Sequence, residues 1–162
     1  MEKYKMHILI CGGTGCRASA SELIQTNLEN ALKAKGLEDE VQVVTTGCFG
    51  FCEKGPIVKI LPDNTFYIEV KPEDADEIIE EHIVKGRQVM RLLYTDPDKK
   101  EVVSDAKNMG FYKKQIRIAL RNCGFINPEN IEEYIARDGY SALGKCFEMT
   151  QQAVIDIVKA SG

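Results

Sequence analysis

The spacing of apolar residues in the first part of the chain predicts four short strands. Each apolar run is short enough for a strand and is bounded by glycine, proline or charged residues. The runs lie at residues 7–11, 41–45, 57–61 and 65–70. The last two are separated only by Pro62-Asp63-Asn64, a turn sequence that predicts an antiparallel hairpin.

Two amphipathic stretches predict helices that flank this sheet. The first begins with a capping box, Ser19 and Glu22, and ends at Gly36. Its apolar stripe is predicted to consist of Leu23, Leu28, Ala31 and Leu32. The second begins at Pro72 and ends at Gly86. Because a βαβ crossover makes the first two strands parallel, the element order predicts an α/β (α+β) fold. We expect a thioredoxin-like four-stranded mixed sheet in the order 2-1-3-4, with the third strand antiparallel to the first.

The remaining sequence carries weaker periodicity. Residues 93–110 lack a sustained pattern and are predicted to form a linker. A short extended segment is then predicted from the alternation of Ile116, Ile118 and Leu120 with other residues, and three short helices from 127–137, 140–149 and 150–162. Such a tail is too small to bury a core by itself, so we expect it to pack against something else. The predicted domains are therefore 1–92, a linker at 93–110 and a short, mostly helical tail at 111–162.

Composition narrows the class of protein. An apolar fraction of 44% with five prolines indicates a folded chain, and no segment approaches the roughly 20 apolar residues of a membrane span. The formal net charge of −4 argues against nucleic-acid binding. The N-terminus lacks a signal-peptide core, so we expect a cytoplasmic protein, with no membrane partner. Clustered cysteines in that compartment more often indicate metal or redox chemistry than disulfides.

A glycine-rich turn, CGGTGC at residues 11–16, follows the first predicted strand. Residues 13–18 fit the dinucleotide-binding pattern G-x-G-x-x-A. That site also needs an acidic residue at the end of the second strand, where this chain has Thr45-Thr46-Gly47. A phosphate cradle is therefore not favoured.

The cysteine spacing favours an iron–sulfur cluster. Cys11 and Cys16 form C-x4-C, and Cys48 and Cys52 form C-x3-C. Both pairs follow parallel strands, whose C-terminal ends meet at one edge of a sheet, and glycines beside them can turn N–H groups toward an anionic cluster. A [2Fe-2S] cluster fits the wide spacing. A zinc-stabilised interaction domain and a thiol oxidoreductase remain alternatives, although zinc usually takes tighter spacing and thiol oxidoreductases usually carry C-x-x-C.

The two loops, CGGTGC and TGCFGFCEKGP, resemble the thioredoxin-like [2Fe-2S] ferredoxin domain over roughly residues 5–92. The spacing differs from the plant-type ferredoxin pattern. The resemblance implies an electron-transfer module with one [2Fe-2S] cluster. It also implies that the cluster ligands are Cys11, Cys16, Cys48 and Cys52, and that no residue is catalytic.

The tail, QIRIALRNCGFINPENIEEYIARDGYSALGK with MTQQAVIDIVKASG, resembles the start of the flavin-carrying, NAD(P)H-oxidising subunit of complex I-type dehydrogenases and multi-subunit [FeFe] hydrogenases. The resemblance implies two kinds of partner, a small [2Fe-2S] subunit and a catalytic subunit. It also implies that FMN, NAD(P) and a [4Fe-4S] cluster belong to a longer parent protein and not to residues 1–162.

Other candidate residues receive structural interpretations. Cys123 and Cys146 are expected to be buried, inert thiols, and neither His7 nor His82 is expected to be a ligand. Arg17 could lie near a cluster or form a surface salt bridge. A solvated face is the favoured interpretation of the basic residues Lys113, Lys114, Arg117 and Arg121, with docking to a partner as the alternative.

Overall fold

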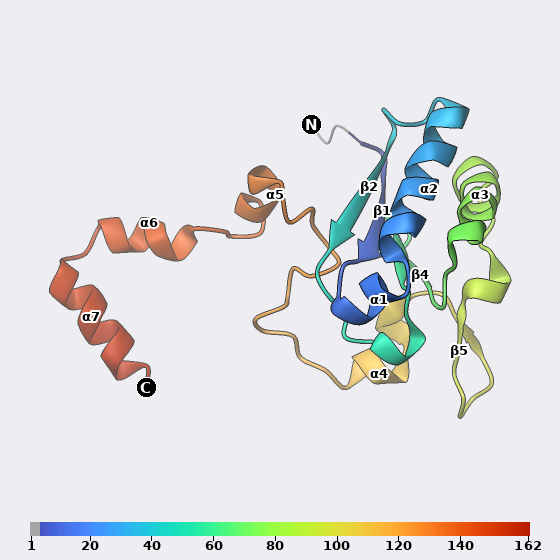
Figure 1. The fold of residues 1–162 in the computed structure, drawn as a ribbon. Helices are drawn as coiled ribbons and strands as arrows, with labels where there is room; N and C mark the ends of the chain where they lie inside the picture. The colour runs from blue at the N-terminus through green and yellow to red at the C-terminus, as the bar shows by residue number, and fades with distance from the viewer. Residues whose placement is uncertain (1–3) are drawn as a thin grey trace. The chain divides into compact units, whose positions relative to one another are not determined.

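The computed structural model describes residues 4–162 and divides the chain into two compact units, one ending at Asn127 and one spanning Pro128–Gly162. The first unit contains a four-stranded sheet in the order β2-β1-β3-β4 (Figure 1). Its strands are β1 Met6–Cys11, β2 Val41–Thr46, β3 Val58–Leu61 and β4 Thr65–Tyr67. The predicted strand order is confirmed, and the fold class is the predicted thioredoxin-like one.

Strand directions also match the prediction. Ile8 in β1 pairs with Val43 in the parallel β2 and with Ile60 in the antiparallel β3. β4 is shorter than the predicted 65–70, because Glu69 adopts a left-handed conformation with φ 51° and the strand ladder ends at Tyr67.

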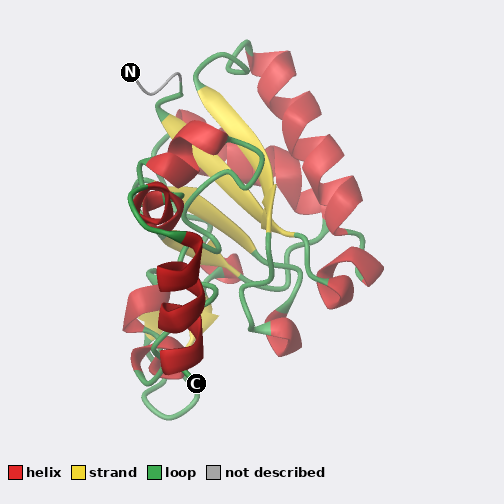
Figure 2. Ribbon diagram, turned by 90° about the vertical axis from the view of Figure 1, so that its left-hand side faces the viewer, coloured by secondary structure: helices red, strands yellow, loops and turns green. Residues whose placement is uncertain are grey.

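One face of the sheet is covered by helix α2 and by a helical segment after β4 (Figures 1 and 2). α2 spans Ser21–Lys35 and ends at Gly36, whose φ of 66° suits the left-handed cap. The segment after β4 comprises a 3₁₀ turn, a short α-helix α3 and a π-helix, at Pro72–Asp74, Ala75–Glu77 and Ile78–Val84.

The start of α2 differs from the prediction. A separate short helix, α1 at Thr14–Ala18, comes first, and Ala20 then adopts a left-handed conformation with φ 68°. The Ser19 capping box is therefore absent, and no side chain caps α2. The buried stripe also differs from the prediction, since Ile24 is fully buried while Leu23 is 51% exposed.

The other face of the sheet is covered by the segment that we expected to be a linker. Residues 93–110 include β5 Tyr94–Thr95, β6 Val102–Val103 and a 3₁₀ turn Ala106–Asn108, followed by α4 Gly110–Lys113. Leu93 bridges to Tyr67 and Asp105 to Thr65, and Met109 is 0% exposed. The first unit therefore continues past residue 92, because burying Leu9, Cys11 and Phe66 on this face requires a covering layer.

Residues after α4 differ in how well they are packed. The predicted extended segment forms no strand, and Ile116 and Ile118 are 91% and 81% exposed. The second unit contains α5 Ile131–Ile135, α6 Ser141–Phe147 and α7 Gln151–Ala160. Thr150 caps α7 by accepting a hydrogen bond from Ala153 N, as predicted. No helix within residues 4–162 is long and apolar enough to cross a membrane.

Candidate metal centre

The two cysteine loops leave the same edge of the sheet. Cys11 is the last residue of β1 and Cys16 lies in α1. Cys48 follows the end of β2, and Cys52 begins a 3₁₀ turn at Cys52–Lys54. Because β1 and β2 are parallel, their C-terminal ends deliver both loops to one rim, as the sequence predicted.

Two glycines keep open the space that the four sulfurs share. Within the second pair, the Cys48 and Cys52 Sγ atoms are 3.8 Å apart. A Cβ atom at Gly13 would lie 3.1 Å from Cys48 Sγ and 3.5 Å from Cys11 Sγ, and one at Gly55 would lie 2.7 Å from Cys16 Sγ. Each loop thus contributes a glycine that faces a sulfur of the other loop. The structure brings all four predicted residues together.

The environment of the rim disfavours deprotonation of two of its thiols, Cys16 and Cys52. Burial, followed by the neighbouring Cys11 thiol, raises the pKa of Cys16 to about 12. The Cys48 thiol likewise raises the pKa of Cys52. Each additional thiolate would repel the others, so a cationic metal is what would allow all four to ionise.

The two cysteines of the first loop are buried, and the start of the loop is held by the sheet. Cys11 and Cys16 are 1% and 2% exposed. Gly12 N donates to Thr46 O at 2.9 Å, and Cys11 N donates to Ile57 O at 3.0 Å. A Cβ atom at Gly12 would lie 2.8 Å from Thr46 O, so only glycine permits this close approach between β1 and β2.

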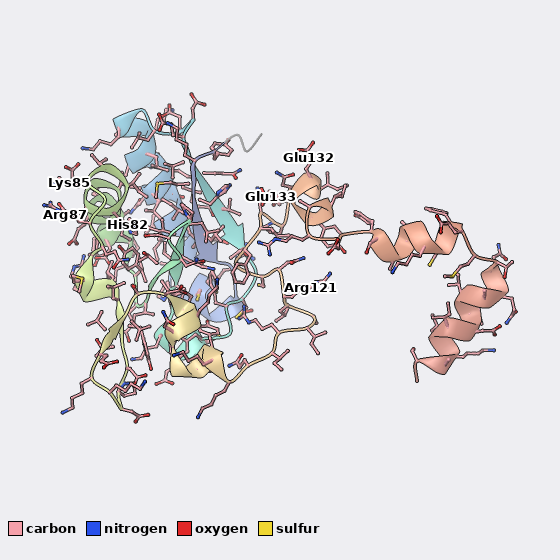
Figure 3. All side chains as sticks on the ribbon, turned by 180° about the vertical axis from the view of Figure 1, so that it is seen from behind. His82, Lys85, Arg87, Arg121, Glu132 and Glu133 are labelled. Atoms are coloured by element: carbon pink, nitrogen blue, oxygen red, sulfur yellow. The ribbon has the colours of Figure 1, made fainter. Side chains whose placement is uncertain are left out.

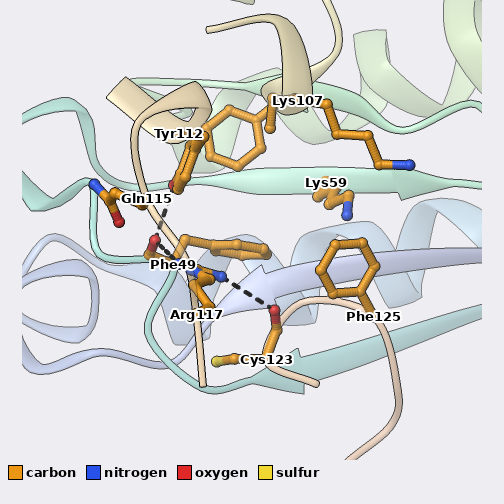
Figure 4. Close-up of a pocket in the computed structure, with 10 residues that line it drawn as sticks. Phe49, Lys59, Lys107, Tyr112, Gln115, Arg117, Cys123 and Phe125 are labelled. Atoms are coloured by element: carbon orange, nitrogen blue, oxygen red, sulfur yellow. Dashed lines mark hydrogen bonds between the residues drawn. The ribbon is translucent and has the colours of Figure 1, made fainter. Parts of the chain in front are cut away.

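The second cysteine loop is more open and is held by residues far along the chain (Figure 4). Its own turn places Gly50, with φ 82°, so that Gly50 N donates to Cys48 Sγ at 3.3 Å. Tyr112 Oη donates to Phe49 O at 2.8 Å, and the Arg117 guanidinium donates to the same oxygen. Cys123 Sγ donates to Cys48 O at 3.3 Å.

Two of our expectations change here. Cys123 lies beside the second loop, although it is 75 residues from Cys48 in sequence, and it is half-buried rather than part of an apolar core. Arg117 does not belong to a solvated basic face, since it bonds to Phe49 O and Cys123 O. The sequence offered one signal for this arrangement, the aromatic pair Phe111-Tyr112 at the end of a stretch without periodicity.

A cavity of about 220 Å³ lies between the second loop and these later residues (Figure 4). Its walls include the rings of Phe49, Phe66, Tyr112 and Phe125. Lys59, which is 4% exposed, donates to Gly124 O at 3.0 Å and lies 3.8 Å from the centre of the Phe125 ring. The cavity is open on one side, and three of the residues that line it, Tyr112, Arg117 and Cys123, also hold the loop.

Arg17 and His82, in the first unit, take no part in the cysteine rim. Arg17 forms an exposed salt bridge with Glu22 at 3.0 Å. His82 is buried at the opposite end of the sheet, where its ring nitrogens contact Asp63 and Tyr67 at 2.9 and 2.7 Å (Figure 3). Cys146 lies in α6 of the second unit. Among residues 4–162, no three or more His, Cys, Asp and Glu side chains are placed so that they could bind one metal ion. The rim sulfurs instead form two pairs, Cys11 with Cys16 and Cys48 with Cys52.

Comparisons with known proteins point to one family. A family model described as thioredoxin-like [2Fe-2S] ferredoxin matches residues 2–82. A [2Fe-2S] ferredoxin of Clostridium pasteurianum is 38% identical over 99 residues, which cover 54% of this chain and 94% of that protein. The crystal structure of the thioredoxin-like [2Fe-2S] ferredoxin from Aquifex aeolicus superimposes with a TM-score of 0.52 at 29% identity, covering 63% of this chain and 99% of the other.

One further relative is longer. The NADP-reducing hydrogenase subunit HndC of Solidesulfovibrio fructosivorans is 60% identical over 50 residues. The matched region covers 31% of this chain and 10% of that subunit. The similarity is high, but it extends over a small part of both proteins.

Proposed function

Since the chain belongs to the thioredoxin-like [2Fe-2S] ferredoxin family, we propose that its four rim cysteines hold one [2Fe-2S] cluster. The observation that carries the proposal is the arrangement of the sulfurs in two pairs, with Gly13 and Gly55 leaving open the space between them. In an all-cysteine cluster each of two irons takes two thiolates, and this donor set fits that requirement. The proposed ligands are Cys11, Cys16, Cys48 and Cys52.

When bound, such a cluster accepts and releases one electron at a time. The chain's own residues would determine how readily the cluster accepts and releases that electron. The burial of Cys11 and Cys16 would shield one side of the cluster from water, and the Gly50 N–H that already bonds Cys48 Sγ would stabilise charge on that sulfur. The exposed Cys52 lies on the side that a redox partner can approach. The chain functions as an electron carrier, and we propose no catalytic residue in it.

We further propose that this carrier works within an NAD(P)-linked multi-subunit hydrogenase or a related dehydrogenase in the cytoplasm. Support comes from the 60% identity with part of the hydrogenase subunit HndC. The partners would be a small [2Fe-2S] subunit and a catalytic subunit, and any FMN, NAD(P) or [4Fe-4S] cluster would be bound by a longer parent protein. A direct test is electron transfer from the reduced, purified chain to a purified candidate subunit, with an unrelated ferredoxin as the comparison.

The ligand assignment is tested by single Cys→Ala changes at the four rim positions. Each change removes one of four thiolates, so we expect the cluster's visible absorption and bound iron to be lost, and the loops to loosen because metal binding is coupled to folding. Cys146→Ala is the matched control, because its thiol lies in α6 and not in a rim loop. This variant should keep the visible absorption and the bound iron. A rim variant that retains full absorption while Cys146→Ala bleaches would reverse the assignment.

A further inference from the structure

Residues 105–125, here called the strap, lie outside the 2–82 region that matches the family model. The strap is anchored before it reaches the second cysteine loop. Asp105 bridges to Thr65 on β4, and the fully buried Met109 packs in the same apolar cluster as Cys11 and Cys16. Its N-terminal half is therefore part of the folded domain.

The far end of the strap is anchored as well. Gly124 N donates to Thr46 Oγ1 at 3.1 Å, and Lys59 Nζ donates to Gly124 O at 3.0 Å. A Cβ atom at Gly124 would lie 2.2 Å from the Phe49 ring, so the chain passes directly against that ring. Both hydrogen bonds are to strand residues, one at the end of β2 and one in β3.

Between these anchors, the strap contacts the second loop at two consecutive backbone carbonyls and at one aromatic ring. Cys123 bonds to the carbonyl of Cys48, and Tyr112 and Arg117 both bond to the carbonyl of Phe49. Two residues further on, the Phe51 ring stacks on Phe111 with ring centres 4.8 Å apart. The loop carries two proposed cluster ligands, yet much of what fixes it comes from outside the matched family domain.

Arg117 also brings charge to this rim. Its guanidinium contacts a backbone oxygen adjacent to Cys48 and lies 5.3 Å from the centre of the Tyr112 ring. It is half-buried, whereas Lys113, Lys114 and Arg121 on the same strap are exposed. A partly desolvated positive charge acts more strongly on its neighbours than an exposed one. A cation at this position favours the more negative, reduced state of a cluster.

We propose that the strap is a clamp, in which Arg117 is a positioning residue that holds the Cys48–Cys52 loop and raises the cluster's reduction potential. The proposal rests on the proposed function for its effect on potential. The hydrogen bonds from the strap to the Phe49 and Cys48 carbonyls are contacts within the protein itself. Their effect on the mobility of the loop can be measured without a cluster.

The test compares Arg117→Gln with Arg121→Gln, a matched loss of one charge from an exposed position of the same strap (Figure 3). In the reconstituted chain, Arg117→Gln should lower the midpoint potential and speed loss of iron to a chelator by about tenfold, because hydrogen bonds to charged groups are strong. In the metal-free chain, amide hydrogen exchange at residues 48–51 should be faster. Arg121→Gln should match the wild type in all three.

Two further variants distinguish the effect of the positive charge of Arg117 from the effect of the hydrogen bonds that hold the loop. Arg117→Lys keeps the charge but loses the planar fork that reaches both carbonyls, so it should restore the potential more than the iron retention. Tyr112→Phe removes only the hydroxyl that bonds Phe49 O and should speed exchange at residues 48–51 without lowering the potential as far as Arg117→Gln. It also serves as the second variant should Arg117→Gln fold poorly.

The outcomes distinguish the clamp from the function on which it rests. A wild-type chain that carries the cluster, with Arg117→Gln and Arg121→Gln equal in potential, iron loss and exchange, would overturn the clamp and leave the carrier function intact. A wild-type chain that takes up no cluster would overturn the function, and the exchange rates of the metal-free variants would then decide the clamp by themselves.

Discussion

The two cysteine loops are built in different ways, although they face the same space. The first loop has two buried cysteines, Cys11 and Cys16, 1% and 2% exposed, and its backbone bonds run to neighbouring strands. The second loop leaves Cys52 exposed. Its end is bonded to residues 69 and 70, but the carbonyls of Cys48 and Phe49 are held by residues 105–125. The first half of the site is therefore fixed by the family's fold, whereas the second half depends in part on the sequence that follows residue 82.

This difference suggests a way for a segment outside the matched region to influence the site without supplying a ligand. The strap buries Met109 against the second face of the sheet and reaches carbonyl oxygens beside Cys48. Changes in the strap should therefore act mainly on the second loop, and changes in the glycines between the loops should act on both. The predictions below test this division.

The largest effect on stability is expected from Met109→Ala. Met109 is 0% exposed, and removing a buried side chain of this size typically costs about 2–5 kcal/mol. Urea unfolding of the metal-free chain should show this loss. Met90→Ala, at a position 62% exposed, should change stability by less than about 0.5 kcal/mol. Equal stabilities for the two variants would mean that residues 105–125 do not cover the sheet.

A smaller effect is expected from filling the space between the loops. Gly13→Ala places a Cβ 3.1 Å from Cys48 Sγ, and Gly55→Ala places one 2.7 Å from Cys16 Sγ. Overpacking of this kind costs about 1–3 kcal/mol, and here the atoms that must move are proposed ligands. Both variants should lose iron to a chelator faster than the wild type, as followed by visible absorption.

Gly15→Ala is the control for these two glycines. It lies in the same glycine-rich turn, and a Cβ there has no atom within 4 Å. Because Gly15 is in α1, alanine should be neutral or stabilise by up to about 1 kcal/mol. If Gly15→Ala lost iron as fast as Gly13→Ala, the turn would be sensitive to any substitution. The result would contradict our claim that Gly13 matters because it leaves room between the sulfurs.

The smallest effect is expected at the end of the sheet opposite both loops. Burial opposes ionisation of Asp63, but hydrogen bonds from His82 and Thr65 outweigh it and lower the pKa of the Asp63 carboxyl. A lowered pKa stabilises the fold fully above the unfolded-state value of about 3.9, and this stabilisation is lost as pH falls through the folded-state pKa.

Asp63→Asn should therefore be less stable than the wild type at neutral pH, by about 1 kcal/mol, because solvent screens the 40% exposed Asp63 side chain although its partner His82 is buried. The two proteins should converge in acid. The visible spectrum of the reconstituted chain should be unchanged, because Asp63 lies far from the cysteine rim. A stability difference that grows on acidification would contradict the assigned direction of the pKa shift.

The sequence predicted the part of the site that local patterns specify. Strand order, strand direction and the meeting of Cys11, Cys16, Cys48 and Cys52 at one edge all follow from the βαβ unit and the hairpin. The strap was missed because its contacts join residues such as Phe49 and Tyr112, 63 positions apart, and leave no periodic pattern. The start of α2 was misplaced because the left-handed Ala20 carries no signal in its side chain.

The most direct test of the account is the metal content of the purified chain after anaerobic reconstitution with iron and sulfide. Four thiolates in two pairs predict two iron and two sulfide ions per chain, the composition of the family's [2Fe-2S] cluster, with a visible spectrum that bleaches on one-electron reduction. The contrary result is one zinc ion per chain and no visible colour in protein made with ample iron. That result would contradict the proposed electron-carrier function.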